Sequence, residues 1–144
     1  MLTELCAEVR NYFLGADPMR NIHQGTYTIS GGAIAPLDFL TEGQYFRIVG
    51  STFNDGVHRY PATDLTDESF AGAVWAMAVP PAVIGLAVEI EKYNAETEKN
   101  KSGYSSESFG GYSYTKFTDS HGAPLSWKKA FADRLKEHRR ANVL

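Results

Sequence analysis

The sequence predicts an α+β fold, in which an antiparallel helical core carries an inserted small antiparallel β-sheet or partial barrel. Two observations favour this class. Apolar residues recur at helical spacing near both ends and in one long stretch from residue 80 onward, whereas residues 23–79 are rich in aromatic and β-branched residues separated by Gly, Asn and Asp turns. With 144 residues, 43% of them hydrophobic and 22% charged, we expect one globular domain.

The long stretch is predicted to be the central helix, against which the other segments pack. It begins at Pro80-Pro81, where a missing N–H costs nothing, and ends near Glu98. No charged residue occurs before Glu89, so the first two turns are apolar on every side, as in a buried helix. This apolar part is much shorter than the ~20 residues that a membrane span needs, so no membrane insertion is expected.

Two further helices are predicted at the ends of the chain. Residues 2–14 form an amphipathic helix capped by Thr3, and Gly15 with Asp17-Pro18 ends it. Residues 126–141 form the last helix, with Ser126 as its cap and a narrow apolar stripe. Three turns are marginal alone in water, so the first helix must dock on another element, most simply on the central helix.

The inserted region is predicted to contain four or five short strands, four of which can be given bounds. Gly72 and Pro80 favour a strand over a helix for the last of them, although its apolar spacing fits both. Turns are expected at residues 30–33 and 54–56. The predicted strands cover residues 26–29, 44–49, 57–60 and 69–79. The resulting organisation is an N-terminal helix over 1–22, a β-rich insertion over 23–79, and the two remaining helices over 80–144.

Residues 99–124 are predicted to be a long polar connection. They are rich in glycine and serine but contain five aromatic residues, and aromatic side chains argue against plain disorder. Connections of this length are usually functional or disordered. We interpret the aromatic part, residues 104–117, as a contact surface; the alternative is a loop folded over its own helices.

Charge is distributed unevenly along the chain. The net charge is −3, but residues 127–144 alone carry +4 and the rest of the chain −7. This polarity would suit head-to-tail stacking or an acidic partner. The alternative is that cations near a helix C-terminus favour its dipole and stay solvated. The basic side chains are Lys128, Lys129, Arg134, Lys136, Arg139 and Arg140.

No pattern for catalysis or cofactor binding is found in the sequence, so we expect no enzyme, no cofactor and no metal. The four histidines are scattered, and neither a P-loop nor a dinucleotide fingerprint occurs. Cys6 is the only cysteine, which excludes an internal disulfide, and nothing near it in sequence would activate it as a nucleophile. A signal-peptide pattern is not visible, which fits synthesis in the cytoplasm.

One motif in the connection resembles a known family. Residues 106–113, Ser-Glu-Ser-Phe-Gly-Gly-Tyr-Ser, are similar to the Ser-Glu-Ser-x-Gly-(Asp/Gly)-Tyr-Ser motif of tailed-phage head–tail connector proteins, which form a ring beneath the portal. The order of a short first helix, a long central helix, this motif and a basic last helix also resembles that family. The blocks at residues 43–58 and 75–82 look like those of prophage proteins of Gram-positive bacteria encoded among head genes. The β-rich insertion departs from the smallest, all-helical connectors.

The resemblance implies a non-enzymatic adaptor of the virion neck, made in the cytoplasm of a bacterial host. About twelve copies would form a ring that docks on the portal, extends the channel for double-stranded DNA without reading its sequence, and binds the stopper or tail-completion protein. The six basic residues of the last helix and its end would contact the portal or the DNA channel. Contacts to a neighbouring subunit or the portal would come from Tyr104, Ser106, Glu107, Ser108, Phe109, Gly110, Gly111, Tyr112 and Tyr114.

Three questions stay open at this point. The β-rich insertion could touch neighbouring subunits, the next ring or the capsid. The chain could instead be the stopper of the same neck, which would predict a β-barrel dominating the fold. A third alternative is a small β-domain binding module or toxin-like enzyme, with a pocket of convergent polar groups in residues 23–79.

Overall fold

The computed structural model describes residues 1–99 and 125–140 and divides the chain into two compact units. Residues 12–80 form the first, here called the sheet unit. The second, the helical unit, contains residues 1–11 and the chain from residue 81 onward.

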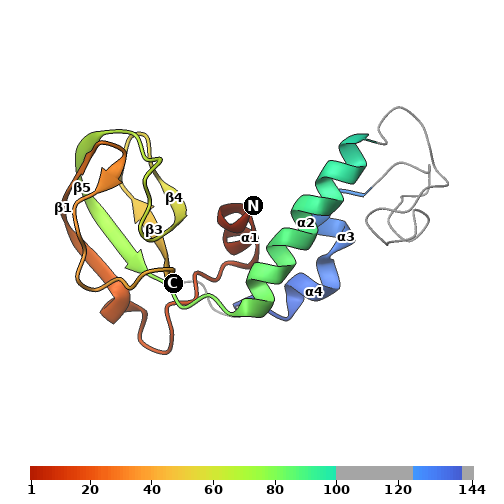
Figure 1. Cartoon of the computed structure of the whole chain (residues 1–144). Coiled ribbons are helices and arrows are strands. Elements are labelled where there is room, and N and C mark those ends of the chain that lie inside the picture. Colours follow the sequence, from red (N-terminus) through yellow and green to blue (C-terminus); the bar gives the residue numbers. More distant parts are fainter. Residues whose placement is uncertain (100–124, 141–144) are drawn as a thin grey trace. The chain divides into compact units, whose positions relative to one another are not determined.

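The sheet unit is built on five antiparallel strands in the order β2-β1-β5-β3-β4, curved into half a barrel (Figure 1). A short 3-10 helix, η1 (Pro18–Asn21), leads into the first strand. The two longest strands, β1 and β5, have nine residues each and pair along eight of them. The strands are β1 (Ile22–Ser30), β2 (Ala33–Ile34), β3 (Tyr45–Val49), β4 (Gly56–Arg59) and β5 (Glu68–Ala76).

One face of this sheet covers its own hydrophobic core. Buried residues alternate with half-buried ones along β3, as expected where one face of a strand packs on a core. Phe46 and Ile48 of β3 and Val74 of β5 are fully buried. Residues from the connections complete this core, namely Leu40, Ala62 and Leu65.

The described residues of the helical unit contain four helices that share a second core. They are α1 (Leu2–Val9), α2 (Pro81–Lys99), α3 (Trp127–Ala130) and α4 (Ala132–Lys136). Tyr93 of α2 lies edge-to-face with Phe131, their ring centroids 5.5 Å apart, and donates a hydrogen bond to the carbonyl of Leu125 at 2.6 Å. The other buried residues of this core are Leu5, Cys6, Val9, Val83, Leu86, Ala87, Ile90 and Leu135.

The predicted fold class is wrong. The five-stranded half-barrel dominates the structure and is accompanied by a few helices; it is not a small insert in a helical core. The error lies in strand length, because the first predicted strand covers only residues 26–29 of what is a nine-residue strand. Gly25 and Gly72, which by propensity weaken a strand, face each other directly in the β1–β5 pair. Gly72 is required there, since a Cβ would lie 2.1 Å from the carbonyl oxygen of Val49.

The end helices are shorter than predicted. α1 ends at Val9, because Arg10 adopts a left-handed conformation with φ 54° and its N–H bonds the carbonyl of Ala7. Tyr12, whose spacing predicts a place in this helix, instead packs in the sheet unit against Trp75. The predicted last helix is two short helices separated by Phe131. Met1, not Thr3, occupies the N-cap of α1.

Candidate functional site

Only one of the two predicted contact surfaces can be placed. The nine residues predicted in the connection, from Tyr104 to Tyr114, lie outside the described residues. The six basic residues lie in residues 127–140, here called the basic segment, which includes α3 and α4.

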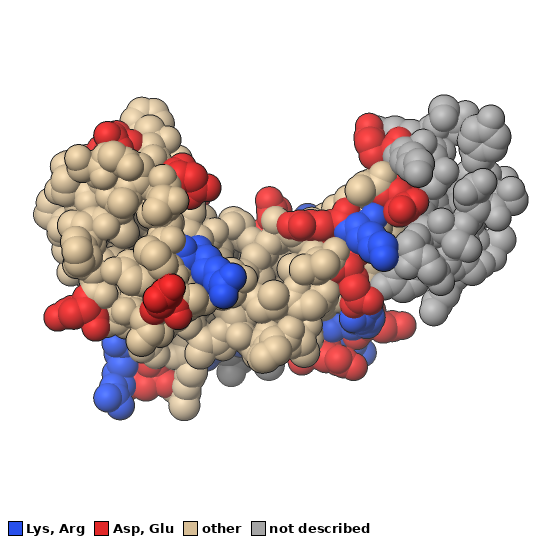
Figure 2. Space-filling view, viewed as in Figure 1, with Lys and Arg blue, Asp and Glu red and all other residues tan. Residues whose placement is uncertain are grey.

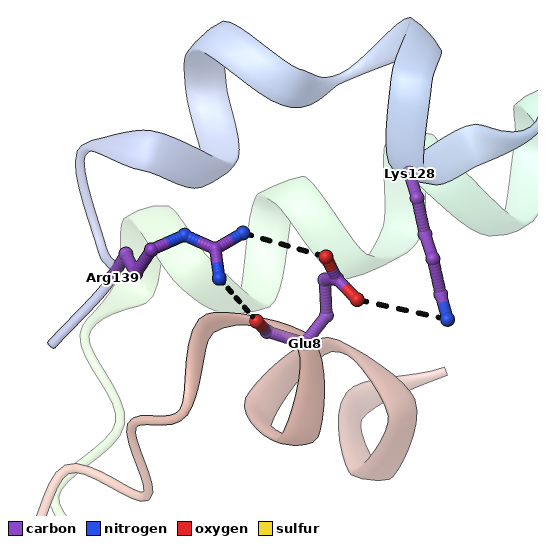
Figure 3. Close-up of polar contacts among 3 residues, drawn as sticks. All are labelled: Glu8, Lys128 and Arg139. Atoms are coloured by element: carbon purple, nitrogen blue, oxygen red, sulfur yellow. Dashed lines mark hydrogen bonds and ion pairs between the residues drawn. The ribbon is translucent and has the colours of Figure 1, made fainter. Parts of the chain in front are cut away.

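Three of the six cations are used inside the helical unit. Glu8 of α1 lies between two of them, with its carboxylate 3.6 Å from Nζ of Lys128 and 3.4 Å from Nη2 of Arg139 (Figure 3). Arg139 also donates through Nη1 to the backbone carbonyl of Glu8 at 2.9 Å. Arg134 pairs with Glu89 of α2. These contacts connect the basic segment to α1 and α2.

The remaining cations are available at the surface. The side chains of Lys129 and Lys136 are exposed, and neither forms an ion pair within residues 1–99 and 125–140. Arg140 contributes its backbone N–H, which donates to the carbonyl of Val9 at 3.0 Å. The basic segment is thus partly neutralised by the helical unit and presents two lysines to solvent.

The sheet unit contains a second ordered surface, at the end where β5 begins. The loop between β3 and β4, residues 51–55 and here called the Phe53 loop, is bound by the carboxylate of Glu68. The backbone N–H groups of Thr52 and Phe53 donate to Glu68 at 3.2 and 3.3 Å, and Ser51 donates through its hydroxyl. One carboxylate therefore satisfies three donors of a single turn.

Asn54 connects this loop to the strand beside it. Its side chain is buried, with Nδ2 donating to Glu68 Oε2 at 2.6 Å and to the carbonyl of Thr66 at 2.8 Å. Its Oδ1 accepts from the N–H of Thr66 at 2.8 Å. The sequence predicts a turn here, but a turn signal does not reveal that the asparagine of the turn will be buried and bonded to residues 66 and 68.

The same hydrogen bonds shift the titration of Glu68. Donation from the Ser51 hydroxyl, reinforced by Asn54 and by the two backbone N–H groups, lowers the pKa of Glu68 below its ordinary value of 4.5, and desolvation opposes this only partly. A carboxylate that accepts several donors holds its charge more readily. Glu68 therefore holds the loop as an anion at neutral pH.

Phe53 is the side chain that this loop presents. It is 66% exposed, although phenylalanine is large and apolar. Three further carboxylates lie at this end of the sheet, which we call the acidic end: Asp55, bonded by the N–H of Ser51; Asp67, bonded by the N–H groups of residues 31 and 32; and Asp64. On the face seen in Figure 2, the end of the sheet unit where β5 begins bears acidic and no basic side chains.

Cations of the sheet unit lie toward its opposite end. Arg47 lies between two aromatic rings, 4.0 Å from the ring centroid of Tyr12 and 4.4 Å from that of Trp75, on the face turned away from the core. Arg59 packs against Tyr45, which begins β3, and Arg20 belongs to η1. The unit as a whole carries three basic and seven acidic side chains, a net charge of −4.

A shallow hollow of about 540 Å³ lies on that outer face, across β1, β5 and β3. Its lining is mostly backbone and small side chains, including Thr26, Gly50 and Ala71. In the described part of the chain, no group of three or more His, Cys, Asp or Glu side chains is arranged to hold a metal ion. Of the helices in residues 1–99 and 125–140, none combines the length and apolarity needed to cross a membrane.

Comparisons of this chain with protein-family models, with curated proteins and with solved structures find no match. The described residues thus present two surfaces of different chemistry. One surface is acidic with an apolar tip, and the other is a basic helical segment.

Proposed function

We propose that this chain is a structural protein of a tailed-phage virion and acts as the head–tail adaptor of the neck. About twelve copies form a ring that docks on the portal, extends the DNA channel and binds the stopper or tail-completion protein. Its role is non-enzymatic, and the protein is made in the bacterial host cytoplasm before it joins the virion. The motif at residues 106–113 and its neighbouring sequence blocks suggest this class.

The observation that carries the proposal is the opposite charge of two separate surfaces. The sheet unit has a net charge of −4, and the basic segment has +4. A closed ring needs a heterologous interface, in which one patch of a subunit meets a different patch of its neighbour. Complementary charge on two patches of one chain supplies such a pair and orients the encounter between copies.

The exposed lysines also suit the wall of a DNA channel. Lys129 and Lys136 could approach phosphates, whose contacts position a protein without reading sequence. Residues 104–114, with their aromatic side chains, remain our predicted contact to the portal or to the neighbouring subunit.

A second candidate is the stopper of the same neck. The observation that favours it is the dominance of the five-stranded half-barrel, since a β-barrel is the fold expected of that protein. The two candidates differ in what they bind. The adaptor binds the portal directly, whereas the stopper binds a preformed adaptor ring.

A binding assay with the portal of the same phage separates these functions. Purified portal is immobilised and this chain is added alone, then together with the other neck proteins. Direct retention by the portal, weakened by Phe109→Ala with Tyr112→Ala, is the result expected for the adaptor. Retention only in the presence of another neck protein would favour the stopper, and no retention under either condition would contradict both.

A further inference from the structure

We infer that Phe53 is the anchor with which the acidic end of one copy binds the basic segment of the neighbouring copy. The inference rests on the proposed ring and names the two patches that would form its interface. Three features of the molecule support it: the hydrogen bonds of the Phe53 loop, the exposure of Phe53 and the charges of both surfaces.

The Phe53 loop is held in one conformation before any partner arrives. On the side of β5, Glu68 accepts a hydrogen bond from the side chain of Asn54. Within the loop, Ser51 Oγ accepts from the N–H of Asn54 at 2.8 Å. His58 Nε2 lies 2.7 Å from the carbonyl oxygen of Asn54, on the β4 side. A side chain on a preordered loop loses less conformational entropy on binding than one on a flexible loop.

Phe53 has the properties of an interface anchor. Its own contribution to the loop is a backbone N–H, which donates to Ser51 Oγ at 3.2 Å and to Glu68, so its ring is not needed for the hydrogen bonding of the turn. The ring is 66% exposed, and the loop that carries it also contains Asp55 and is bonded to Glu68. An aromatic side chain with a polar rim is the usual arrangement at the centre of a protein interface.

The charge of the acidic end indicates which kind of partner it binds. The acidic end carries the carboxylates named above, whereas Arg20, Arg47 and Arg59 all lie elsewhere in the sheet unit. A second acidic end would be repelled, whereas the basic segment offers exposed Lys129 and Lys136 without ion pairs in the described residues. The apolar parts of half-buried Trp127 and Ala130 lie in the same segment. A second copy of this chain therefore supplies both the charge and the apolar surface.

Two variants remove the two patches separately. Phe53→Ala removes the anchor, and the double variant Lys129→Glu with Lys136→Glu reverses the lysines. Met19→Ala is the matched control for the first, because Met19 is 71% exposed in the same unit. Lys92→Glu, on an exposed position of α2, controls for the second. We expect each patch variant to weaken self-association by on the order of tenfold or more, and each control to leave it within about twofold.

Mixing the two patch variants tests the pairing itself. Neither variant should form rings alone, but the intact Phe53 loop of the lysine variant can bind the intact basic segment of the Phe53 variant. Native mass measurement of the mixture should therefore show a one-to-one complex that grows no further. Rings that persist in either variant, or a mixture that stays monomeric, would overturn the inference. Melting curves of each variant establish that it is folded.

The outcomes separate this inference from the proposed function. If the wild-type chain binds the portal and its rings also form in the Phe53→Ala variant, the adaptor role stands and only the interface is overturned. If the chain assembles through Phe53 but ignores the portal and the other neck proteins, the interface stands and the adaptor role fails. A chain that stays monomeric at every concentration overturns the interface, whatever it does with the portal.

Discussion

Asn54 and Glu68 bind each other across the Phe53 loop, with Nδ2 of Asn54 donating to Oε2 of Glu68 at 2.6 Å. Both side chains also bond the backbone around them, so the loop, the start of β5 and the preceding connection form one hydrogen-bonded cluster. The exposed Phe53 is therefore part of an ordered structure.

Asn54→Ala should lower the free energy of unfolding of the sheet unit by about 2 kcal/mol, because it removes a buried side chain that makes three hydrogen bonds, two to the backbone of Thr66 and one to Glu68. Thr52→Ala is the matched control, since Thr52 bonds Glu68 through its backbone N–H; its effect should stay within about 0.5 kcal/mol. Denaturant unfolding followed by Trp75 fluorescence, in a Trp127→Phe background, measures both. Equal effects of the two variants would contradict this role of Asn54.

Acidification should loosen the Phe53 loop through Glu68. The pKa of Glu68 is lowered in the folded protein, so its carboxylate stabilises the fold above the ordinary value of 4.5, and this contribution is lost as the pH falls through the lowered pKa. Glu68→Gln should consequently be less stable than the wild type at pH 7, with a difference that shrinks at acid pH. Unfolding of both proteins across this range is the measurement. A difference that does not change with pH would mean that the charge of Glu68 has no part in holding the loop.

The basic segment should be held mainly by its apolar residues. Glu8→Gln weakens two exposed ion pairs and should cost less than about 1 kcal/mol, and less still at high salt. Leu135→Ala removes a fully buried side chain and should cost about 2–5 kcal/mol. Unfolding of the helical unit is followed by Trp127 fluorescence in a Trp75→Phe background. A larger loss for Glu8→Gln would show that the ion pairs of Figure 3 dominate instead.

Replacing two of the glycines by alanine should change the stability of the protein in opposite directions. Gly72→Ala places a Cβ 2.1 Å from the carbonyl oxygen of Val49, a backbone atom, and should destabilise the sheet unit by about 3 kcal/mol. Gly85→Ala in α2 meets no atom within 4 Å and should stabilise the helical unit by about 0.5–1 kcal/mol, through the higher helix propensity of alanine. Thermal unfolding of both variants is the measurement. A stabilised Gly72→Ala protein would contradict the close approach of β3 and β5.

The local elements were largely predictable from the sequence, whereas the arrangement of the strands was not. Pro80 and Pro81, where α2 begins, and the apolar first turns locate that helix to within a residue, and the assignment of β5 as a strand is confirmed. Strand length depends on the partner, however. β1 continues through Gly25 because β5 provides a glycine opposite, which propensity at either position alone does not reveal.

The candidate site could be predicted only in part. Six clustered cations identify the basic segment, but the pairing of three of them with Glu8 and Glu89 is a tertiary contact that the sequence does not reveal. The sequence does not identify Phe53 as a contact residue. The available signal is its position directly before Asn-Asp-Gly, which places an aromatic residue in a turn. Glu68 and Asn54 are fourteen residues apart, and only the β-sheet brings them together.

The most direct test of the adaptor role is the mass of the purified chain, measured alone and then mixed with the portal of the same phage. The account predicts a complex that contains about twelve copies of this chain on the portal ring. A chain whose mass is unchanged by the portal would contradict the adaptor role.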